Sequence, residues 1–418
     1  MAEIFLKIDK PYKGKYAFLH TGFRPFFLLS AWFSAILMLV WGAILNHGKP
    51  NLGSIYANST PIAWHGHEML FGFALAVIAG FLLTAVKNWT QQKTYTHLGL
   101  AVLAILWLIP RFLAFIPFAE QNRENAIFFN MLAENLFLLM LCWKFSSILI
   151  KTQKYMQFAI IGKLWLFIPA SVCFHLGLLG IWNNGVCVGL YSAFYLILAL
   201  ILTMARRVMP MFIERGVGVP GVVVKNFPSV DKFSLILFLL FAIIGVAVQI
   251  LPENKELAFA FMILAAVQAI LHILRLGGWY HKAIWQKPLL WSLFAGYICI
   301  VGGFLLAVLE YFGVIPAMTL SLHSFAVGGI GLFTFALMAR ISLGHTGRSV
   351  FTPPKYLNFC FIFLLIAFVG RVLILTFFPE YRTLGLHLSQ TCWILASVIF
   401  GVLYTKILIL ARVDGVKG

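Results

Sequence analysis

Two histidines, a glutamate and a methionine stand together at residues 64–69, where the sequence reads Trp-His-Gly-His-Glu-Met. Imidazole nitrogens, carboxylate oxygens and thioether sulfurs are side-chain atoms that bind transition metals. The segment leads directly into a long apolar run at 70–86. Polar groups next to hydrocarbon are costly to keep, so their presence there predicts a function. These residue types favour a metal centre.

Composition assigns the chain to a structural class. Hydrophobic residues make up 62% and charged residues 11% of the 418 residues, and the mean hydropathy is +0.95. Soluble domains are about half apolar and about a quarter charged. We therefore expect an all-α integral membrane protein, a bundle of about twelve transmembrane helices. The expected spans are 26–46, 69–88, 98–117, 126–148, 162–181, 185–205, 233–251, 257–275, 289–312, 316–339, 356–378 and 386–411.

A single membrane domain is expected, because no long polar stretch separates the apolar runs. The predicted organisation is a cytoplasmic basic N-terminal arm at 1–25, one transmembrane helical domain at 26–412 and a short cytoplasmic tail at 413–418. The first apolar run follows the basic arm and has no small-residue cleavage site, so we interpret it as a retained helix and not as a signal peptide.

The distribution of positive charge predicts the topology. The formal net charge is +18, and when alternate connections are assigned to opposite sides, most of the 31 Lys and Arg residues fall on the side that holds both termini. The exceptions are Lys49, Arg111, Arg123, Lys255, Arg371 and Arg382. By the positive-inside rule, both termini are then cytoplasmic. The charge is expected to attract anionic membrane lipid, and nucleic-acid binding is not expected, because no polar domain carries a basic patch interleaved with aromatics.

Topology also sorts the eleven histidines. Five are expected at a similar depth, near the outer ends of four helices: His65, His67, His175, His323 and His387. With a rise of about 1.5 Å per residue, all five would lie within about 10 Å of the outer boundary of the apolar slab. Imidazole binds copper, iron and zinc, and facing helices of a bundle are a common scaffold for such ligands. We expect a metal or haem centre in the outer half; the alternative is a set of interhelical hydrogen bonds.

Two buried cations are predicted at a comparable depth. Arg111 and Arg371 lie in the outer halves of the third and eleventh spans. Each is expected to pair with a buried acid, Glu134 or Glu310, or with a haem propionate. Glu68 is expected either to orient a neighbouring histidine or to be an interfacial carboxylate.

Several motifs of the chain resemble those of the NnrS family. The longest covers 64–73 and continues through an Ala-Gly-Phe-Leu-Leu-Thr-Ala-Val segment to Asn-Trp-Thr at 88–90. The others are Phe-Arg-Pro-Phe-Phe at 23–27, Leu-His with Val-Gly-Gly-Ile-Gly at 322–331, and Met-Ala-Arg leading to Leu-Gly-His-Thr-Gly-Arg at 338–348. Together they extend over nearly the whole chain.

The resemblance implies a twelve-span bacterial inner-membrane protein that carries haem and copper. It implies a role in nitric oxide metabolism, in denitrification or in resistance to nitrosative stress, with nitric oxide as a small diatomic ligand. The family motif positions match at His65, His67, His323 and His345, and Arg348 lies in the same motif as His345, so both of these inner residues are expected to bind cofactor. Relatives often carry histidine where this chain has Phe294, and proline where it has Lys87.

Two other classes stay open. A divergent subunit of a haem-copper oxidase or nitric oxide reductase would also have many membrane histidines, but the chain has no adjacent His-His pair and no His-Pro-Glu-Val-Tyr element. A twelve-helix secondary transporter would show related halves and discontinuous helices. Redox or nitric oxide-processing activity is a further hypothesis, and the sequence predicts no particular protein partner.

Overall fold

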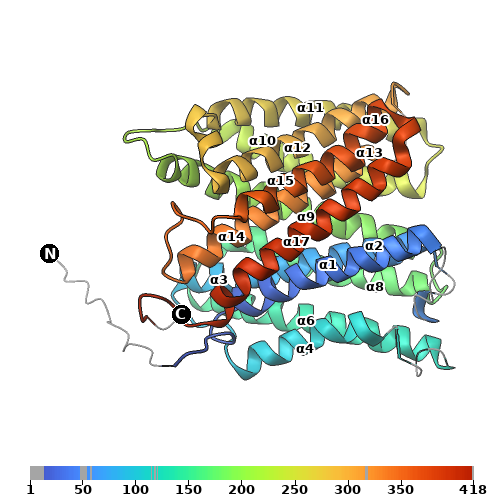
Figure 1. Ribbon diagram of the computed structural model, residues 1–418. Helices are drawn as coiled ribbons and strands as arrows, with labels where there is room; N and C mark the ends of the chain where they lie inside the picture. The colour runs from blue at the N-terminus through green and yellow to red at the C-terminus, as the bar shows by residue number, and fades with distance from the viewer. Residues whose placement is uncertain are drawn as a thin grey trace.

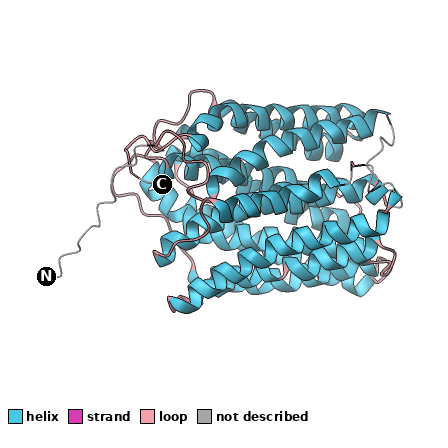
Figure 2. Cartoon of the chain, turned by 90° about the horizontal axis from the view of Figure 1, so that it is seen from below, coloured by secondary structure: helices cyan, strands magenta, loops and turns pink. Residues whose placement is uncertain are grey.

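The computed structural model describes residues 14–47, 54–56, 59–113, 115–116, 119, 121–315 and 319–416. Helices account for nearly all of the regular structure in these ranges, which confirms the expected all-α fold. Eleven described helical segments are long and apolar enough to span a membrane, and the apolar helix α4 (Leu98–Leu113) is shorter. Figures 1 and 2 show the helices side by side along one common direction. Residues 1–13 of the expected arm and residues 417–418 of the expected tail lie outside the described residues.

The described part of the first half builds five long spans and the shorter apolar helix α4. Its elements are α1 (Phe23–His47), η1 (Ser54–Tyr56), α2 (Pro61–His67), η2 (Glu68–Ala74), α3 (Leu75–Thr90), α4, α6 (Arg123–Lys151), η3 (Tyr155–Gln157), α7 (Phe158–Trp165), α8 (Phe167–Leu178) and α9 (Gly185–Gly216).

The second half builds six more. Its elements are α10 (Pro228–Ile250), α11 (Lys255–Trp279), η4 (Lys282–Gln286), α12 (Pro288–Tyr311), α13 (Leu320–His323), η5 (Ser324–Leu332), α14 (Phe333–His345), α15 (Leu357–Phe368), η6 (Val369–Ile374), α16 (Leu375–Phe377), η7 (Pro379–Tyr381) and α17 (Arg382–Ile409).

The second span begins earlier than predicted, at Pro61 instead of residue 69. The side chain of Thr60 accepts a hydrogen bond from the Ala63 amide at 3.3 Å, and the proline fills the first helical position. Both features are signals for the start of a helix. The Thr60 side chain accepts a hydrogen bond from an amide that has no partner inside the helix, and proline has no amide hydrogen that would need one. The early start places His65 and His67 within the helix.

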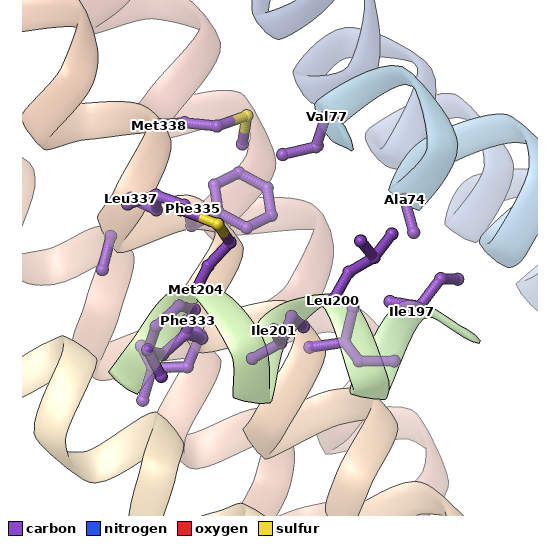
Figure 3. Close-up of a cluster of buried hydrophobic side chains, with 14 of the residues drawn as sticks. Ala74, Val77, Ile197, Leu200, Ile201, Met204, Phe333, Phe335, Leu337 and Met338 are labelled. Atoms are coloured by element: carbon purple, nitrogen blue, oxygen red, sulfur yellow. The ribbon is translucent and has the colours of Figure 1, made fainter. Parts of the chain in front are cut away.

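Three of the spans contain a π-helical segment: η2, η5 and η6. π-Helices are rare and are frequent at functional sites. In the two spans that carry η2 and η5, 78% of the most apolar window is buried, the largest share among the described spans. These spans are therefore central in the bundle. Figure 3 shows apolar side chains gathered between them and α9, among them Val77, Leu200 and Phe335.

The first and last spans pack against each other and bring the two ends of the chain together. Helix α1 contacts α17 along its length. The Ala17 amide donates to the Ile409 carbonyl at 2.9 Å, and the Ala411 amide donates to the Lys15 carbonyl at 3.0 Å. The segments next to both termini thus lie at one end of the bundle.

Arg24 joins these two spans. Its side chain is fully buried, and its Nη1 donates to the carbonyls of Ile407 at 3.4 Å, Leu408 at 3.0 Å and Leu410 at 2.7 Å. The last carbonyls of a helix have no partner within the helix, so they need donors from elsewhere. The guanidinium of Arg24 therefore completes the end of α17.

We predict that Arg24→Met lowers the free energy of unfolding by about 1–3 kcal/mol, because buried carbonyls lose a charged donor. Arg24→Lys should recover only part of the loss, since an ammonium group lacks the planar fork of donors. Thermal unfolding of the detergent-solubilised protein measures the effect, with the exposed Arg382→Met as control. Equal melting temperatures for the two methionine variants would contradict this role.

Candidate metal centre

His67 is fully buried at the junction of α2 and η2. Its Nδ1 lies 2.9 Å from Glu68 Oε1 and 3.3 Å from the Tyr56 hydroxyl. The ring contacts Phe174 and Phe71 in near-parallel orientation, with centroid distances of 4.5 and 5.1 Å, and the two phenyl centroids lie 6.5 Å apart. Because an ionised carboxylate only accepts hydrogen bonds, Nδ1 carries a proton toward Glu68. This contact fixes the direction of the ring, so that Nε2 is the nitrogen that would bind a metal.

His175 presents its other ring nitrogen in the same way. It is fully buried on α8, and its Nδ1 lies 2.8 Å from the Ser171 carbonyl one turn earlier. A carbonyl oxygen only accepts, so Nδ1 donates the proton. Its Nε2 is buried and has no hydrogen-bond partner among the described residues. The two rings are perpendicular, at a centroid distance of 5.7 Å.

Glu134 on α6 completes a group of three. Its Oε1 accepts a hydrogen bond from the Ser171 hydroxyl at 2.6 Å, and its Oε2 lies 3.2 Å from His67 Nε2. One ligand atom from each of His67, Glu134 and His175 falls within 4.8 Å of the other two, and all three residues are buried. His67 Nε2 makes no hydrogen bond of good geometry despite its short distance to the carboxylate. An arrangement of two free imidazole nitrogens and one carboxylate oxygen matches the donor set of a transition metal.

Arg111 on α4 lies beside this group and bridges its acids. Its Nε donates to Glu68 Oε2 at 2.9 Å, its Nη2 lies 3.5 Å from Glu134 Oε2, and its Nη1 donates to the Trp107 carbonyl at 3.0 Å. Gly72 lies close to this pair and to Phe33: a Cβ at this position would lie 2.7 Å from Phe33 Cε1, 3.1 Å from Glu68 Oε2 and 3.4 Å from Arg111 Nε. The expected pairing of Arg111 with Glu134 is confirmed, and that with Glu68 is additional.

The charges in this cluster fit a bound cation. Two carboxylates face one guanidinium, so one negative charge stays uncompensated while His67 is neutral. Buried charges are costly unless they are paired or coordinate a metal. A metal ion or a protonated imidazole would supply the missing positive charge. The unpartnered Nε2 of His175 favours the metal, because a protonated His67 would leave that atom without a role.

The family of the chain follows from a comparison with family models. The model described as NnrS protein matches residues 17–412, which is nearly the whole chain. The chain belongs to the NnrS family. No curated protein matches it. The matched region of this NnrS chain begins and ends within the paired terminal segments and includes all three residues of the cluster.

Only two of the five outer histidines that the sequence predicted together lie in this cluster. His65 is on another side of α2 from His67, as expected for positions two apart on a helix. It stacks on Trp41 at a centroid distance of 4.3 Å, and its Nδ1 is buried without a partner among the described residues. Arg371 in η6 lies close enough to act electrostatically on both His65 and His323, and His65 acts on His323 in the same way. These three side chains form a second group, separate from the cluster.

The remaining predicted site residues lie elsewhere. His387 is exposed on α17, and none of the contacts of the described residues joins it to the other predicted ligands. At the end of the bundle that holds both terminal segments, His345 lies 3.4 Å from the Asn88 amide and next to Phe23, and Arg348 donates to the nearby Thr346 carbonyl at 3.4 Å. Both are therefore at the opposite end of the bundle from the cluster.

Two further predicted positions have structural partners. Glu310 accepts hydrogen bonds from the Leu320 and Ser321 amides, at 2.9 and 3.0 Å, and so caps α13 instead of pairing with Arg371. Phe294, where relatives often have histidine, packs against Tyr280 and Trp285.

Sequence reasoning treated Glu134 as a partner for arginine and not as a ligand, and it did not consider Ser171. A depth argument applied to carboxylates would have found Glu134, which lies eleven residues from the outer start of α6, near the level of the outer histidines. The role of Ser171 depends on which way its hydroxyl points, and spacing alone does not predict that.

We predict that Arg111→Met destabilises the protein by about 3–5 kcal/mol, because it leaves two buried carboxylates without their cation. Adding Glu68→Gln should recover part of this loss, since it removes one of the two negative charges. Chemical or thermal unfolding in detergent measures both variants against wild type. A double variant as unstable as Arg111→Met would show that charge balance is not what Arg111 provides.

Proposed function

We propose that the protein is a haem- and copper-containing protein of the bacterial inner membrane that acts in nitric oxide metabolism or in resistance to nitrosative stress. Membership of the NnrS family supports the link to nitric oxide. The buried group of His67, Glu134 and His175 supports a metal centre and is the observation that carries the proposal.

In this proposal the cluster holds copper through Nε2 of His67, Nε2 of His175 and Oε2 of Glu134. Two imidazoles and a carboxylate suit both copper and iron, so the donor set itself is compatible with either metal. Three protein ligands leave a coordination position open. The bound metal supplies a redox-active position at which nitric oxide can bind.

The surrounding side chains hold and shield the ligands. Glu68 orients His67 through Nδ1, and Ser171 orients both Glu134 and His175. Such partners fix the tautomer and direction of a ligating imidazole and raise its basicity. The stacked rings of Phe71 and Phe174 exclude water from His67, which strengthens electrostatic interactions in the site.

The second group supports a haem site. His323 donates from Nδ1 to the Thr319 carbonyl at 2.8 Å, which leaves Nε2 as its ligand atom, and His65 Nδ1 has no partner among the described residues. Arg371 has a buried Nη1 without a partner in the same part of the chain. His65 and His323 would supply imidazoles to a haem, and the Arg371 guanidinium would pair with a propionate.

The proposed orientation places both groups in the periplasmic half, with cytoplasmic termini. The uneven distribution of Lys and Arg supports it. We predict that a green fluorescent protein fused after residue 418 is fluorescent in a bacterial host, whereas alkaline phosphatase fused at the same point is inactive. The reverse pair of results would contradict the orientation.

We predict that the two groups lose different cofactors when they are mutated. His67→Ala and His175→Ala should each lower copper content severalfold, because three-ligand binding is broken, and leave the haem absorption band unchanged. His65→Ala and His323→Ala should weaken or shift that band. Absorption spectra of oxidised, reduced and nitric oxide-treated protein, with copper and iron measured by mass spectrometry, test this, and His387→Ala is the matched control.

Normal copper content in both His67→Ala and His175→Ala would remove the basis for the copper site. A colourless, metal-free wild-type protein would instead favour the transporter alternative.

A further inference from the structure

In the part of the chain that the structure describes, the buried side-chain amide of Asn130 on α6 makes no contact that explains why a polar residue is found there. Its side chain is fully buried, and neither its Oδ1 nor its Nδ2 has a hydrogen-bond partner among the described residues. Buried polar side-chain atoms nearly always have a partner, and leaving one unpaired costs about 1–3 kcal/mol. An amide with both ends free therefore indicates a group that binds there.

The position of Asn130 follows from the register of α6 against α8. Glu134 and Asn135 of α6 both contact the Ser171 hydroxyl of α8, at 2.6 and 3.2 Å. The two helices belong to consecutive spans and run in opposite directions. One turn outward from this contact lies Asn130 on α6 and His175 on α8. Asn130 also shares a helix face with Glu134, four residues later.

The register thus places the open amide at the level of the open ligand atoms. The Nε2 atoms of His175 and His67 are likewise buried without a hydrogen-bond partner among the described residues, and His67 Nε2 lies 3.2 Å from Glu134 Oε2. The nearby polar groups are already engaged: Tyr56 contacts His67 Nδ1, and Ser171 donates to Glu134. Asn130 is left with a donor and an acceptor for whatever occupies the centre.

We propose that Asn130 Nδ2 donates a hydrogen bond to the small ligand that occupies the open coordination position of the metal held by His67, Glu134 and His175. This inference rests on the proposed metal centre. Asn130 is a specificity-determining residue: it favours ligands that accept a hydrogen bond, such as azide or hydroxide, over carbon monoxide, a poor acceptor. Charge-assisted hydrogen bonds are stronger than neutral ones, so the discrimination is greatest for anions.

The test compares Asn130→Leu with Gln268→Leu in the full-length, metal-loaded protein. Gln268 on α11 is a suitable control because it is also fully buried and carries an amide, which donates to the Ser234 carbonyl of α10 at 2.8 Å. Azide is titrated into the oxidised protein and carbon monoxide into the reduced protein, both followed by absorption, and copper content is measured by mass spectrometry.

Asn130→Leu is expected to keep its copper and its carbon monoxide affinity and to bind azide about tenfold more weakly, the effect of about one such hydrogen bond. Gln268→Leu should leave all three quantities unchanged. Unaltered azide affinity in Asn130→Leu would overturn the proposal. Loss of copper from Asn130→Leu alone would also overturn it, because Asn130 would then be a metal ligand.

If the leucine variant does not fold, Asn130→Ser and Asn130→Ala decide the same point. Only serine keeps a donor, so only the serine variant should retain tighter azide binding, and equal affinities would contradict the role. A wild-type protein without copper would instead overturn the metal centre itself, and the two failures are therefore distinguishable.

Discussion

The buried charges around Arg111 constrain the arrangement of the helices around the candidate metal centre. A guanidinium placed among apolar helices is stable only if acids reach it, and those acids come from two other elements, η2 and α6. Glu134 in turn depends on the Ser171 hydroxyl of α8. Four segments distant in sequence must therefore meet at one point before the charge is compensated. The same convergence brings His67 and His175 together, so the ion pair and the metal ligands depend on one arrangement.

The π-helical segments explain how this arrangement is built within straight, apolar spans. η2 begins immediately after His67, η5 begins immediately after His323, and η6 contains Arg371. A π-turn adds a residue to the helix and so rotates the side chains that precede it relative to those that follow. Glycine occurs at the corresponding place in the first two segments. A Cβ at Gly72 would lie 2.7 Å from Phe33 Cε1, and a Cβ at Gly328 would lie 2.4 Å from Cys299 Cβ on α12. In both spans a glycine follows the histidine five residues later, Gly72 after His67 and Gly328 after His323. In both spans the glycine is sterically required.

Much of the fold could be predicted because length and apolarity determine which segments cross a bilayer. Depth was also predictable, since rise per residue is constant, and it correctly brought His175 near the level of His67. The direction in which a side chain points around the helix axis could not be predicted. In α17, apolar residues occur on every face, so periodicity does not show that His387 points outward. Only Gly66 separates His65 from His67 in the motif, but two residues at this spacing on a helix point in different directions and contact different neighbours.

The hydrogen bonds between Arg24 and the end of α17 affect how the protein is assembled in the membrane. Arg24 enters the membrane with the first span, but the carbonyls that accept its hydrogen bonds belong to Ile407, Leu408 and Leu410. During synthesis from the N-terminus, the Arg24 guanidinium lacks these carbonyl acceptors until α17 has been made. Water and lipid head groups at the interface must solvate it until then. Helix α1 can pack against α17 only after α17 has left the ribosome. A ribosome that stalls before α17 is made therefore leaves the α17-facing side of α1 without its partner helix.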